Sequence, residues 1–385
     1  MAERSFQHEV GKLRASKGEV FKGEGILAVT KALLESGVSY VGGYQGSPIS
    51  HLMDVLADAR DILDDLGVHF EACGSEATAA AMLSASINYP LRGAVTWKST
   101  VGTNVASDAL SNLASSGVNG GAVVIVGEDY GEGSSIMQER TYAFAMKAQM
   151  WLLDPRPDLP SIVSLVKQSF ELSECSHTPV FFMMRIRGCH VTGEFLANDN
   201  IAPEYNSNSH LIPEREQEKI ILPPNVYDQE EEKLTKRLPA AIDYIIHNKL
   251  NEFFPGRYRQ LGIIVQGGLY NLIIRALQRQ GLADVYGVSD IPIYVMNVAY
   301  PLVPDEILEF SQGKQQLLII EEGQPDYIEQ GIQTVLRRAE QNLRVYGKDI
   351  MPMAGEYTGQ VMLEGLTRFI EAADLPTAQR LLDLS

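Results

Sequence analysis

A glutamate and four polar segments in the first half of the chain have residue types that could do chemistry. Glu76 lies in a run of small residues, Gly-Ser-Glu-Ala-Thr-Ala-Ala-Ala at 74–81, directly after a short strand-like segment. The other segments are Gly-Tyr-Gln-Gly-Ser-Pro at 43–48, Lys-Ser-Thr-Val-Gly at 98–102, Gly-Glu-Asp at 127–129 and Gln-Glu-Arg-Thr at 138–141. Each follows an apolar strand candidate or opens a helix. In an open α/β sheet all of them would meet at the carboxyl edge, where ligands bind, so together they predict a catalytic half-site.

Two interpretations of Glu76 remain open from the residues alone. An acid in a first helical turn is stabilised by the positive end of the helix dipole, and a Ser-Glu pair there is also what simple capping favours. Against capping, the residues from Ala77 to Ala81 are so small that another molecule or subunit could approach the helix closely. A solvent-facing cap has no need of such an approach, so the alternative is a buried acid with a chemical role.

Ser47 and Arg140 also have two interpretations each. Ser47 lies where the backbone reverses between a strand and a helix, but the glycines and the proline explain that turn by themselves. Arg140 is expected within a helix at about 136–147. It either forms a surface ion pair with Glu139 or Glu132, or clamps a substrate carboxylate, for which a guanidinium has the right planar fork.

Strand and helix patterns alternate between residues 25 and 187, and this alternation predicts a parallel, doubly wound α/β sheet covered on both faces. The expected strands lie at 40–43, 68–70, 94–97, 122–126 and 179–185. The expected helices lie at 26–36, 51–66, 75–87, 104–116, 136–147 and 160–175.

A second alternating block predicts a smaller α/β domain, and at 385 residues the chain is long enough for two domains. Its expected strands are 261–265, 293–298 and 317–320, and its helices 269–280, 304–310, 327–341 and 360–372. The predicted organisation is an N-terminal extension (1–24), a first domain (25–187), a linker with one helix in the stretch 238–254 (188–257), the smaller domain (258–375) and a tail (376–385).

Composition and charge argue against several classes of protein. Hydrophobic residues make up 45% of the chain and charged residues 21%, which is ordinary for a globular α/β protein. A formal net charge of −17 disfavours nucleic acid or an anionic membrane as a partner. The N-terminus lacks the apolar core of a signal peptide, and the apolar runs are too short to cross a bilayer, so the expected compartment is the cytoplasm.

Several common site types have no counterpart in the sequence. The three cysteines, Cys73, Cys175 and Cys189, lack the spacing of a zinc or iron–sulfur site, and we expect no metal bound by this chain alone. The turn Gln-Gly-Gly at 266–268 lacks the rest of a dinucleotide-binding motif, and neither a P-loop nor a G-x-S-x-G elbow occurs.

The polar segments resemble those of the α subunit of indolepyruvate ferredoxin oxidoreductase, within the thiamine-diphosphate-dependent 2-oxoacid:ferredoxin oxidoreductases. The resemblance runs from about Gly25 to about Ala372. Its most family-specific stretches are Ala-Tyr-Pro-Leu-Val-Pro at 299–304 and Ile-Glu-Glu-Gly-Gln-Pro-Asp-Tyr-Ile-Glu at 320–329. It implies that the first domain binds the aminopyrimidine ring of the coenzyme, and that the smaller domain is like the C-terminal domain of transketolase.

The resemblance also implies roles for individual residues. Glu76 matches the catalytic glutamate that contacts the aminopyrimidine ring. The cofactor-binding positions implied beside it are Gly46, Pro48, Ser99 and Thr100.

Ser47 and Arg140 match positions that hold the substrate carboxylate. Ser47 stands where threonine is usual and Gln45 where proline is usual. The resemblance favours an aryl 2-oxo acid as substrate, oxidatively decarboxylated to an acyl-CoA.

The sequence lacks two parts that such a reaction needs. No Gly-Asp-Gly motif with a downstream asparagine is present to hold Mg²⁺ and the diphosphate, and no cysteine cluster is present to accept electrons. The resemblance therefore implies a partner chain or a missing domain that carries the Mg²⁺ site and iron–sulfur clusters, in a homo- or hetero-oligomer. Two alternatives stay open: a component of a nonoxidative thiamine-dependent decarboxylase or carboligase, and a non-catalytic scaffold.

Overall fold

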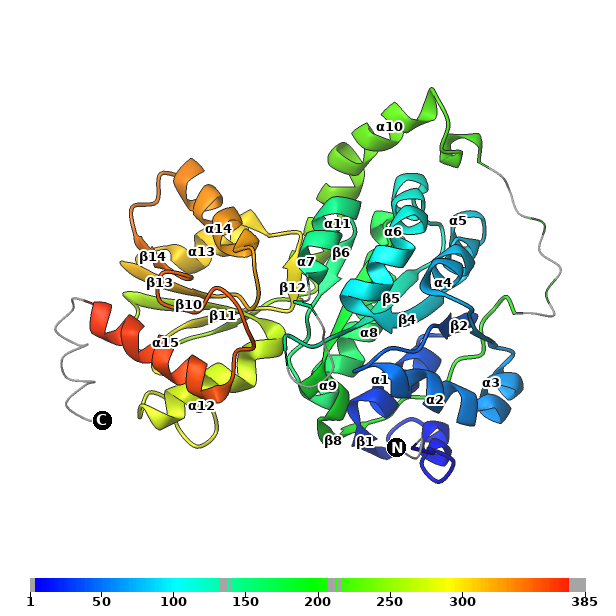
Figure 1. Ribbon diagram of the computed structural model, residues 1–385, viewed down its shortest axis with the longest axis horizontal. Coiled ribbons are helices and arrows are strands. Elements are labelled where there is room, and N and C mark those ends of the chain that lie inside the picture. The colour runs from blue at the N-terminus through cyan, green and yellow to red at the C-terminus, as the bar shows by residue number, and fades with distance from the viewer. Residues whose placement is uncertain are drawn as a thin grey trace.

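The computed structural model describes residues 4–131, 137–138, 140–206, 209, 212 and 216–373. In this part of the chain two α/β sheets lie next to each other, each covered by helices (Figure 1). The expected tail, residues 376–385, lies outside the described residues.

The larger sheet has seven strands in the order β12-β6-β7-β5-β4-β2-β3, and only β12 runs antiparallel to its neighbour. Its strands are β2 (Tyr40–Gly43), β3 (His69–Ala72), β4 (Gly93–Lys98), β5 (Ala122–Glu128), β6 (Trp151–Leu153), β7 (Val180–Arg185) and β12 (Val298–Tyr300). The strands β4, β5 and β7 are buried almost throughout, as strands covered on both faces must be.

Helices cover both faces of this sheet (Figure 1). One face carries α1 (Gly25–Glu35), α2 (Ser50–Asp58), α3 (Arg60–Leu66) and α8 (Leu159–Ser176), and the other carries α4 (Glu76–Leu83), α6 (Ser99–Ser116) and α7 (Thr141–Ala148). The remaining helices of this part are α5 (Ala85–Asn88), α9 (Ile186–His190), α10 (Asn225–Glu232) and α11 (Leu238–His247).

The N-terminal residues pack onto the first domain. Phe6, Leu13 and Phe21 are buried in the same hydrophobic cluster as α1 and α8. The strand β1 (Val20–Glu24) pairs antiparallel with β8 (Thr192–Leu196), which follows β7. The boundaries predicted at residues 24, 187 and 257 stay predictions.

The smaller sheet has the order β14-β13-β10-β11-β9, in which only β9 is antiparallel. Its strands are β9 (Glu252–Phe254), β10 (Leu261–Gln266), β11 (Ile293–Met296), β13 (Gln316–Ile320) and β14 (Arg344–Tyr346). The helices α12 (Tyr270–Arg279) and α15 (Gly359–Ala372) cover one face, and α13 (Pro304–Ser311) and α14 (Tyr327–Arg338) the other.

The two sheets share one hydrophobic cluster. It joins Val124 and Phe181 of the larger sheet to Ile264 and Tyr294 of the smaller one. The strand β12 also leaves the smaller domain to pair with β6 of the larger sheet. The domains are therefore joined by a common core and by shared strand pairing.

The predicted architecture, a mostly parallel α/β sheet followed by a smaller α/β domain, is confirmed. Several element boundaries were wrong. The helix expected at 104–116 begins at Ser99, and the helices expected at 51–66 and 75–87 are each divided in two, at Ala59 and Ser84. The strand expected at 293–298 divides at Asn297, and the predictions missed both β6 and α10.

Among the described residues, no helix combines the length and the apolar character that crossing a bilayer requires. The same part of the chain contains no group of three or more His, Cys, Asp or Glu side chains arranged to hold a metal ion.

Candidate active site

The predicted site residues lie at one edge of the larger sheet. The parallel strands β2, β3, β4 and β5 all end there, as their register shows: Gly43 pairs with Ala72 and Thr96, and Lys98 pairs with Gly127. The loops and helix starts that follow these strands carry the polar segments. Parallel topology therefore brings the segments together, as the sequence predicted.

The environment of Glu76 bears on its two interpretations. Its residue is only 7% exposed, at the first position of α4. The capping contacts belong to other residues: the Ser75 hydroxyl accepts from the Thr78 N–H at 3.3 Å, and the Thr78 hydroxyl accepts from the Ser75 N–H at 3.0 Å. The described residues offer the Glu76 carboxyl neither a hydrogen bond nor an ion pair. A helix cap does not need this acid, so a largely buried residue whose carboxyl has no partner among the described residues is available for another role.

The neighbouring helix leaves room for this carboxyl. A Cβ atom on Gly102, the fourth residue of α6, would lie 2.5 Å from Trp97 Cδ1 and 2.8 Å from Glu76 Cγ. Glycine is the residue that fits there. The Trp97 indole is fixed in turn, because its Nε1 donates to the Thr103 hydroxyl at 3.1 Å.

The loop after β2 packs directly on the start of α6. Lys98 Nζ donates to the Ser47 carbonyl at 2.8 Å, and a Cβ on Gly46 would come within 2.6 Å of Lys98 Cβ. Pro48 is buried, whereas Ser47 is exposed at this edge. A cavity of about 500 Å³ opens beside the loop. It is lined by residues of β2, β3, α2 and the segments that directly follow the two strands: Gly43, Tyr44, Gln45, Met53, Asp54, Ala57, Phe70, Ala72 and Cys73.

Ser99 and Thr100 lie in the first turn of α6 and not in a loop, which corrects the expectation from the sequence. Both are buried. The Ser99 hydroxyl is hydrogen-bonded to the Thr141 hydroxyl at the start of α7. This contact holds the α6 and α7 helix starts together, and the predicted cofactor-binding role of both residues stays a prediction.

Arg140 was expected inside a helix, but it is the N-cap residue of α7, with φ −151° and ψ 42°. Its half-buried side chain donates from Nη1 to the Gln138 carbonyl at 3.5 Å. The surface partners considered for it, Glu132 and Glu139, lie outside the described residues. Arg140 is held near the edge because the next residue, Thr141, contacts both Ser99 and β5.

The sequence prediction gave no role to the segment at 127–129 beyond its position. In the structure the Glu128 carboxylate is buried and accepts from the Thr141 N–H at 3.2 Å. The start of α7 is thus tied to the end of β5. The available signal in the sequence was the pair of adjacent acids, Glu128 and Asp129, after the apolar run at 122–126.

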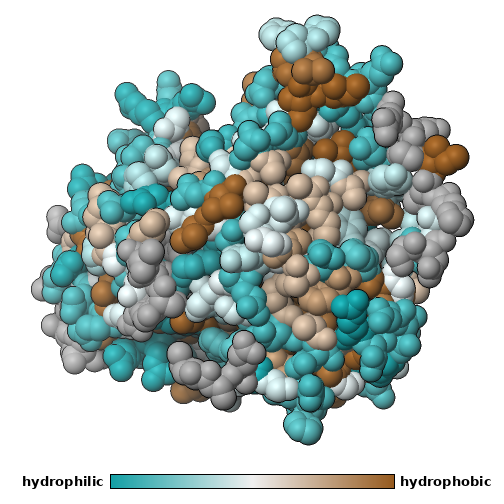
Figure 2. Space-filling model, turned by 45° about the vertical axis from the view of Figure 1, so that its right-hand side comes forward, coloured by the Kyte–Doolittle hydropathy of each residue, from teal (hydrophilic) through white to brown (hydrophobic). Residues whose placement is uncertain are grey.

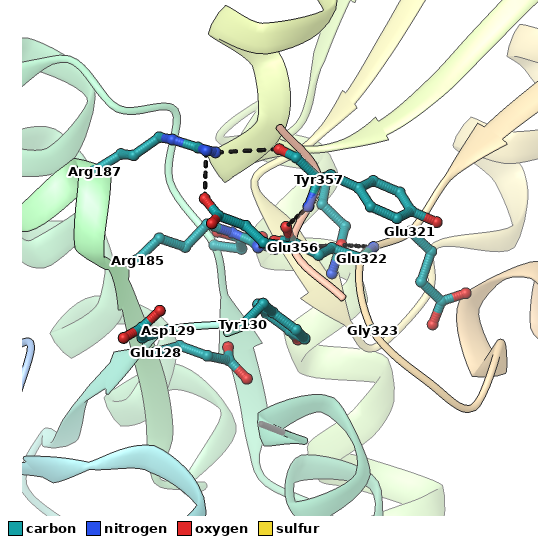
Figure 3. Close-up of polar contacts among 12 residues, drawn as sticks. Glu128, Asp129, Tyr130, Arg185, Arg187, Glu321, Glu322, Gly323, Glu356 and Tyr357 are labelled. Atoms are coloured by element: carbon teal, nitrogen blue, oxygen red, sulfur yellow. Dashed lines mark hydrogen bonds and ion pairs between the residues drawn. The ribbon is translucent and has the colours of Figure 1, made fainter. Parts of the chain in front are cut away.

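A buried arginine at the domain interface was missed altogether (Figure 3). Arg185, at the end of β7, donates from Nη2 to Asp154 at 2.8 Å and is paired with Glu322, two residues after β13. It also donates to Gln266 Oε1 at 3.2 Å, at the end of β10. Burial opposes the charge of the Arg185 guanidinium, but the two carboxylates outweigh it and raise the pKa. The ends of strands from both sheets therefore meet at one cation.

A second arginine links the domains nearby. Arg187 is paired with the Glu356 carboxylate and donates to the Tyr357 carbonyl at 3.3 Å, as Figure 3 shows. The Tyr357 N–H donates to Glu322 at 2.6 Å, so the segment before α15 is joined to the Arg185 network. Burial raises the pKa of Glu322, although Arg185 acts in the opposite direction.

Comparison with known proteins finds several relatives that carry the same name. No protein-family profile matches the chain. Indolepyruvate oxidoreductase subunit IorA of Methanothermobacter thermautotrophicus is 27% identical over 361 residues, which are 92% of this chain and 56% of the relative. The same subunit of Methanothermobacter marburgensis is 28% identical over 94% of this chain and 58% of the relative. The chain is a relative of these IorA subunits.

The relationship confirms the resemblance drawn from the motifs, over almost the whole sequence. The IorA subunit of Pyrococcus abyssi, 26% identical over 89% of this chain and 51% of its own length, shows the same pattern. The chain spans about half the length of the curated relatives it matches.

Solved structures support the fold. A 2-oxoglutarate:ferredoxin oxidoreductase from Magnetococcus marinus matches with a TM-score of 0.65 and 14% identity, over 91% of this chain and 65% of that one. A split-gene transketolase, described as an inactive β4 tetramer, matches with a TM-score of 0.54 and 14% identity, over 90% of this chain and 98% of that one. At this identity the likeness shows the fold alone.

Proposed function

We propose that this chain is one component of a thiamine-diphosphate-dependent 2-oxoacid:ferredoxin oxidoreductase and that it holds the aminopyrimidine end of the coenzyme. One observation carries the proposal: the buried Glu76 carboxyl at the carboxyl edge of the sheet, whose capping role is taken by Ser75 and Thr78. The relationship to the IorA subunits supports the assignment.

The residues present fit the aminopyrimidine ring. A carboxyl without a protein partner can share a proton with a ring nitrogen, and the missing side chain of Gly102 leaves the space beside it. Gly46 and Pro48 hold the opposite loop against α6. When bound, the coenzyme supplies the electron sink for decarboxylation. Glu76 would then hold a proton and exchange it with the ring nitrogen.

Ser47 and Arg140 are proposed to bind the carboxylate of a 2-oxo acid. Ser47 is exposed at the edge, and the guanidinium of Arg140 suits a carboxylate because it can donate two parallel hydrogen bonds. The cavity of about 500 Å³ beside this loop, with Tyr44, Met53 and Phe70 in its lining, has the volume and character to accept an aryl side chain. We therefore propose an aryl 2-oxo acid, such as indolepyruvate, as substrate and an acyl-CoA as product.

The proposal needs protein beyond this sequence. The Mg²⁺ and diphosphate site and the iron–sulfur centres are assigned to a partner chain or to a further domain. A surface suited to such a partner lies on α4 and α6, where Ala81, Val101 and Val105 are exposed next to Glu76. Figure 2 shows a broad pale-brown area of weakly apolar residues on the larger domain. Such an area is typical of a contact surface.

The test is the Glu76→Gln variant in the assembled complex, with Glu71→Gln as its control. Glu71 is an exposed carboxylate of β3 near His69, so its loss should change nothing in the site. Glu76→Gln should lower the oxidation rate of the 2-oxo acid by about two to four orders of magnitude, the usual effect of removing a general acid or base. Exchange of the thiazolium C2 proton for deuterium, followed by NMR, should slow in parallel.

Three results would separate the proposal from its rivals. If Glu76→Gln keeps both the rate and the proton exchange of the wild type, the assignment of the site is wrong. If calorimetry detects no binding of thiamine diphosphate by the complex, the chain is a scaffold. If the complex decarboxylates the 2-oxo acid without reducing ferredoxin, the nonoxidative alternative is correct.

A further inference from the structure

Gln138 connects the candidate active site to the smaller domain. Its side-chain Nε2 donates to the Tyr130 carbonyl at 2.8 Å, in the loop that follows β5. Its Oε1 accepts from the Gly355 N–H of the smaller domain at 3.3 Å. One carboxamide therefore uses both ends to bridge the two domains, two residues before Arg140.

Tyr130, the residue that Gln138 holds, is itself anchored by the interface (Figure 3). Its residue is 7% exposed, and its ring centroid lies 5.4 Å from the Arg185 guanidinium. Gly323 of the smaller domain has φ +87°, and a Cβ there would overlap the Tyr130 ring. The position of Tyr130 is thus fixed by groups from both domains, so the carbonyl that Gln138 contacts is a rigid reference point.

Contacts on both sides of Arg140 involve its side chain and the next backbone N–H. On one side the Gln138 carbonyl accepts from Arg140 Nη1 at 3.5 Å. On the other side the Thr141 N–H donates to the Glu128 carboxylate at 3.2 Å. Arg140 has no helical backbone of its own to orient it, because it precedes the first turn of α7. Its direction therefore depends on these flanking contacts.

We propose that Gln138 is a positioning residue: by joining Tyr130 to Gly355, it lets the smaller domain set the direction of the Arg140 guanidinium. The inference rests on the proposed function, in which Arg140 binds the substrate carboxylate. A planar guanidinium binds a carboxylate well only when both of its donors are aligned with the two oxygens. On this proposal the smaller domain contributes to the substrate site through its contact with Gln138.

The test is Gln138→Leu in the assembled complex, with Gln330→Leu as a matched control. Leucine keeps the approximate size of the side chain and removes both hydrogen bonds. Gln330 is an exposed residue of α14 whose amide contacts only Asp326 among the described residues, so its variant should behave as the wild type. For Gln138→Leu the KM for the 2-oxo acid should rise about tenfold, the scale expected for a small misplacement of a binding group. The kcat and the affinity for thiamine diphosphate should stay within about twofold, because uniform substrate binding is what is lost.

A double-mutant cycle with Arg140→Ala shows whether Gln138 acts through the arginine. If it does, Gln138→Leu should have no further effect on KM once Arg140 is absent. Gln138→Asn gives a second test. It keeps the polar carboxamide, which Gln138→Leu removes. Its side chain is one methylene too short to reach both partners, so it should raise KM in the same direction.

The inference is overturned if Gln138→Leu and Gln138→Asn both keep the wild-type KM, or if the effects of Gln138→Leu and Arg140→Ala are additive. It is also overturned if the coenzyme affinity falls together with the substrate affinity, because a merely structural contact would act in that way. These results all require a wild-type complex that binds the coenzyme and turns over a 2-oxo acid. A wild-type complex that does neither would instead refute the proposed function.

Discussion

Replacing Glu321 by glutamine should make the stability of the protein depend less on pH between about 4.5 and 7. The Glu321 residue is 4% exposed, and its two carboxylate oxygens accept from the N–H groups of Ile328 at 3.1 Å and Glu329 at 3.0 Å. Burial raises its pKa to about 7, against the opposing effect of the two N–H groups and of Lys348. The negative charge of Asp326 acts in the same direction as burial.

The sign and size of the effect follow from this pKa. Because the folded protein binds the proton more tightly than the unfolded chain, Glu321 contributes stability that is fully present below pH 4.5 and is lost as the pH rises through about 7. The interval from 4.5 to about 7, at about 1.4 kcal/mol for each pH unit, amounts to about 3 kcal/mol. Glutamine binds no proton. It also loses one acceptor for the α14 N–H groups, but that cost is the same at every pH.

The free energy of unfolding is measured by urea denaturation at several values between pH 4.5 and 8, for the wild type and for Glu321→Gln. The difference, wild type minus variant, should fall by about 3 kcal/mol across this range. Glu364→Gln serves as control, since Glu364 is an exposed acid of α15, and its curve should run parallel to the wild type. A difference between the wild type and Glu321→Gln that stays constant from pH 4.5 to 8 would refute the reasoning.

Two further substitutions test the contacts around the site. Gly102→Ala should weaken the binding of thiamine diphosphate in calorimetry, because the new Cβ would lie 2.8 Å from Glu76 Cγ and must displace that side chain; Gly359→Ala, where nothing lies within 4 Å of the new atom, should bind as the wild type does. Arg185→Met should lower the free energy of unfolding by about 3 to 5 kcal/mol, because it leaves two buried carboxylates without their cation. Adding Glu322→Gln should restore part of that loss in urea denaturation at pH 7, and an equal loss in both variants would contradict this account.

The alternation of strands and helices was readable from the sequence because both faces of the larger sheet are covered. Continuous apolar runs such as 122–126 have the length of a buried strand, and the small-residue run after Phe70 marked the start of α4. The meeting of the polar segments at one edge then followed from parallel topology alone. This is why the predicted site residues could be placed together without knowledge of side-chain contacts.

Boundaries failed where packing overrides local preference. Gly102 weakens a helix by its backbone freedom, so the sequence favoured a loop before residue 104. In the structure α6 nevertheless begins at Ser99, and Gly102 lies inside it at a position where a Cβ would be 2.5 Å from Trp97 Cδ1. The run at 293–298 looks like one strand. In the structure the Asn297 amide donates to the Leu250 carbonyl and to the Glu252 carboxylate, and beyond this anchor the chain enters the other sheet.

The interface arginine could not be predicted because its partners are distant in the sequence. Arg185 and Glu322 are separated by 137 residues, and each alone resembles a charged residue at the end of a buried strand. Periodicity describes which face of an element is buried, but it does not say which strand ends of two domains will oppose each other. The same limit applies to Gln138, whose two partners lie in different domains.

These non-local contacts connect the smaller domain to the proposed site, although that domain supplies none of the predicted site residues. The shared hydrophobic cluster and the pairing of β12 with β6 fix how the sheets lie. The Arg185 network then joins the strand ends of both sheets at the level where the substrate is proposed to bind. A motion of the smaller domain would therefore shift Tyr130 and Gln138 with it, and through them the loop that carries Arg140. In the proposed arrangement, the packing of the two domains therefore also sets how Arg140 binds the substrate carboxylate.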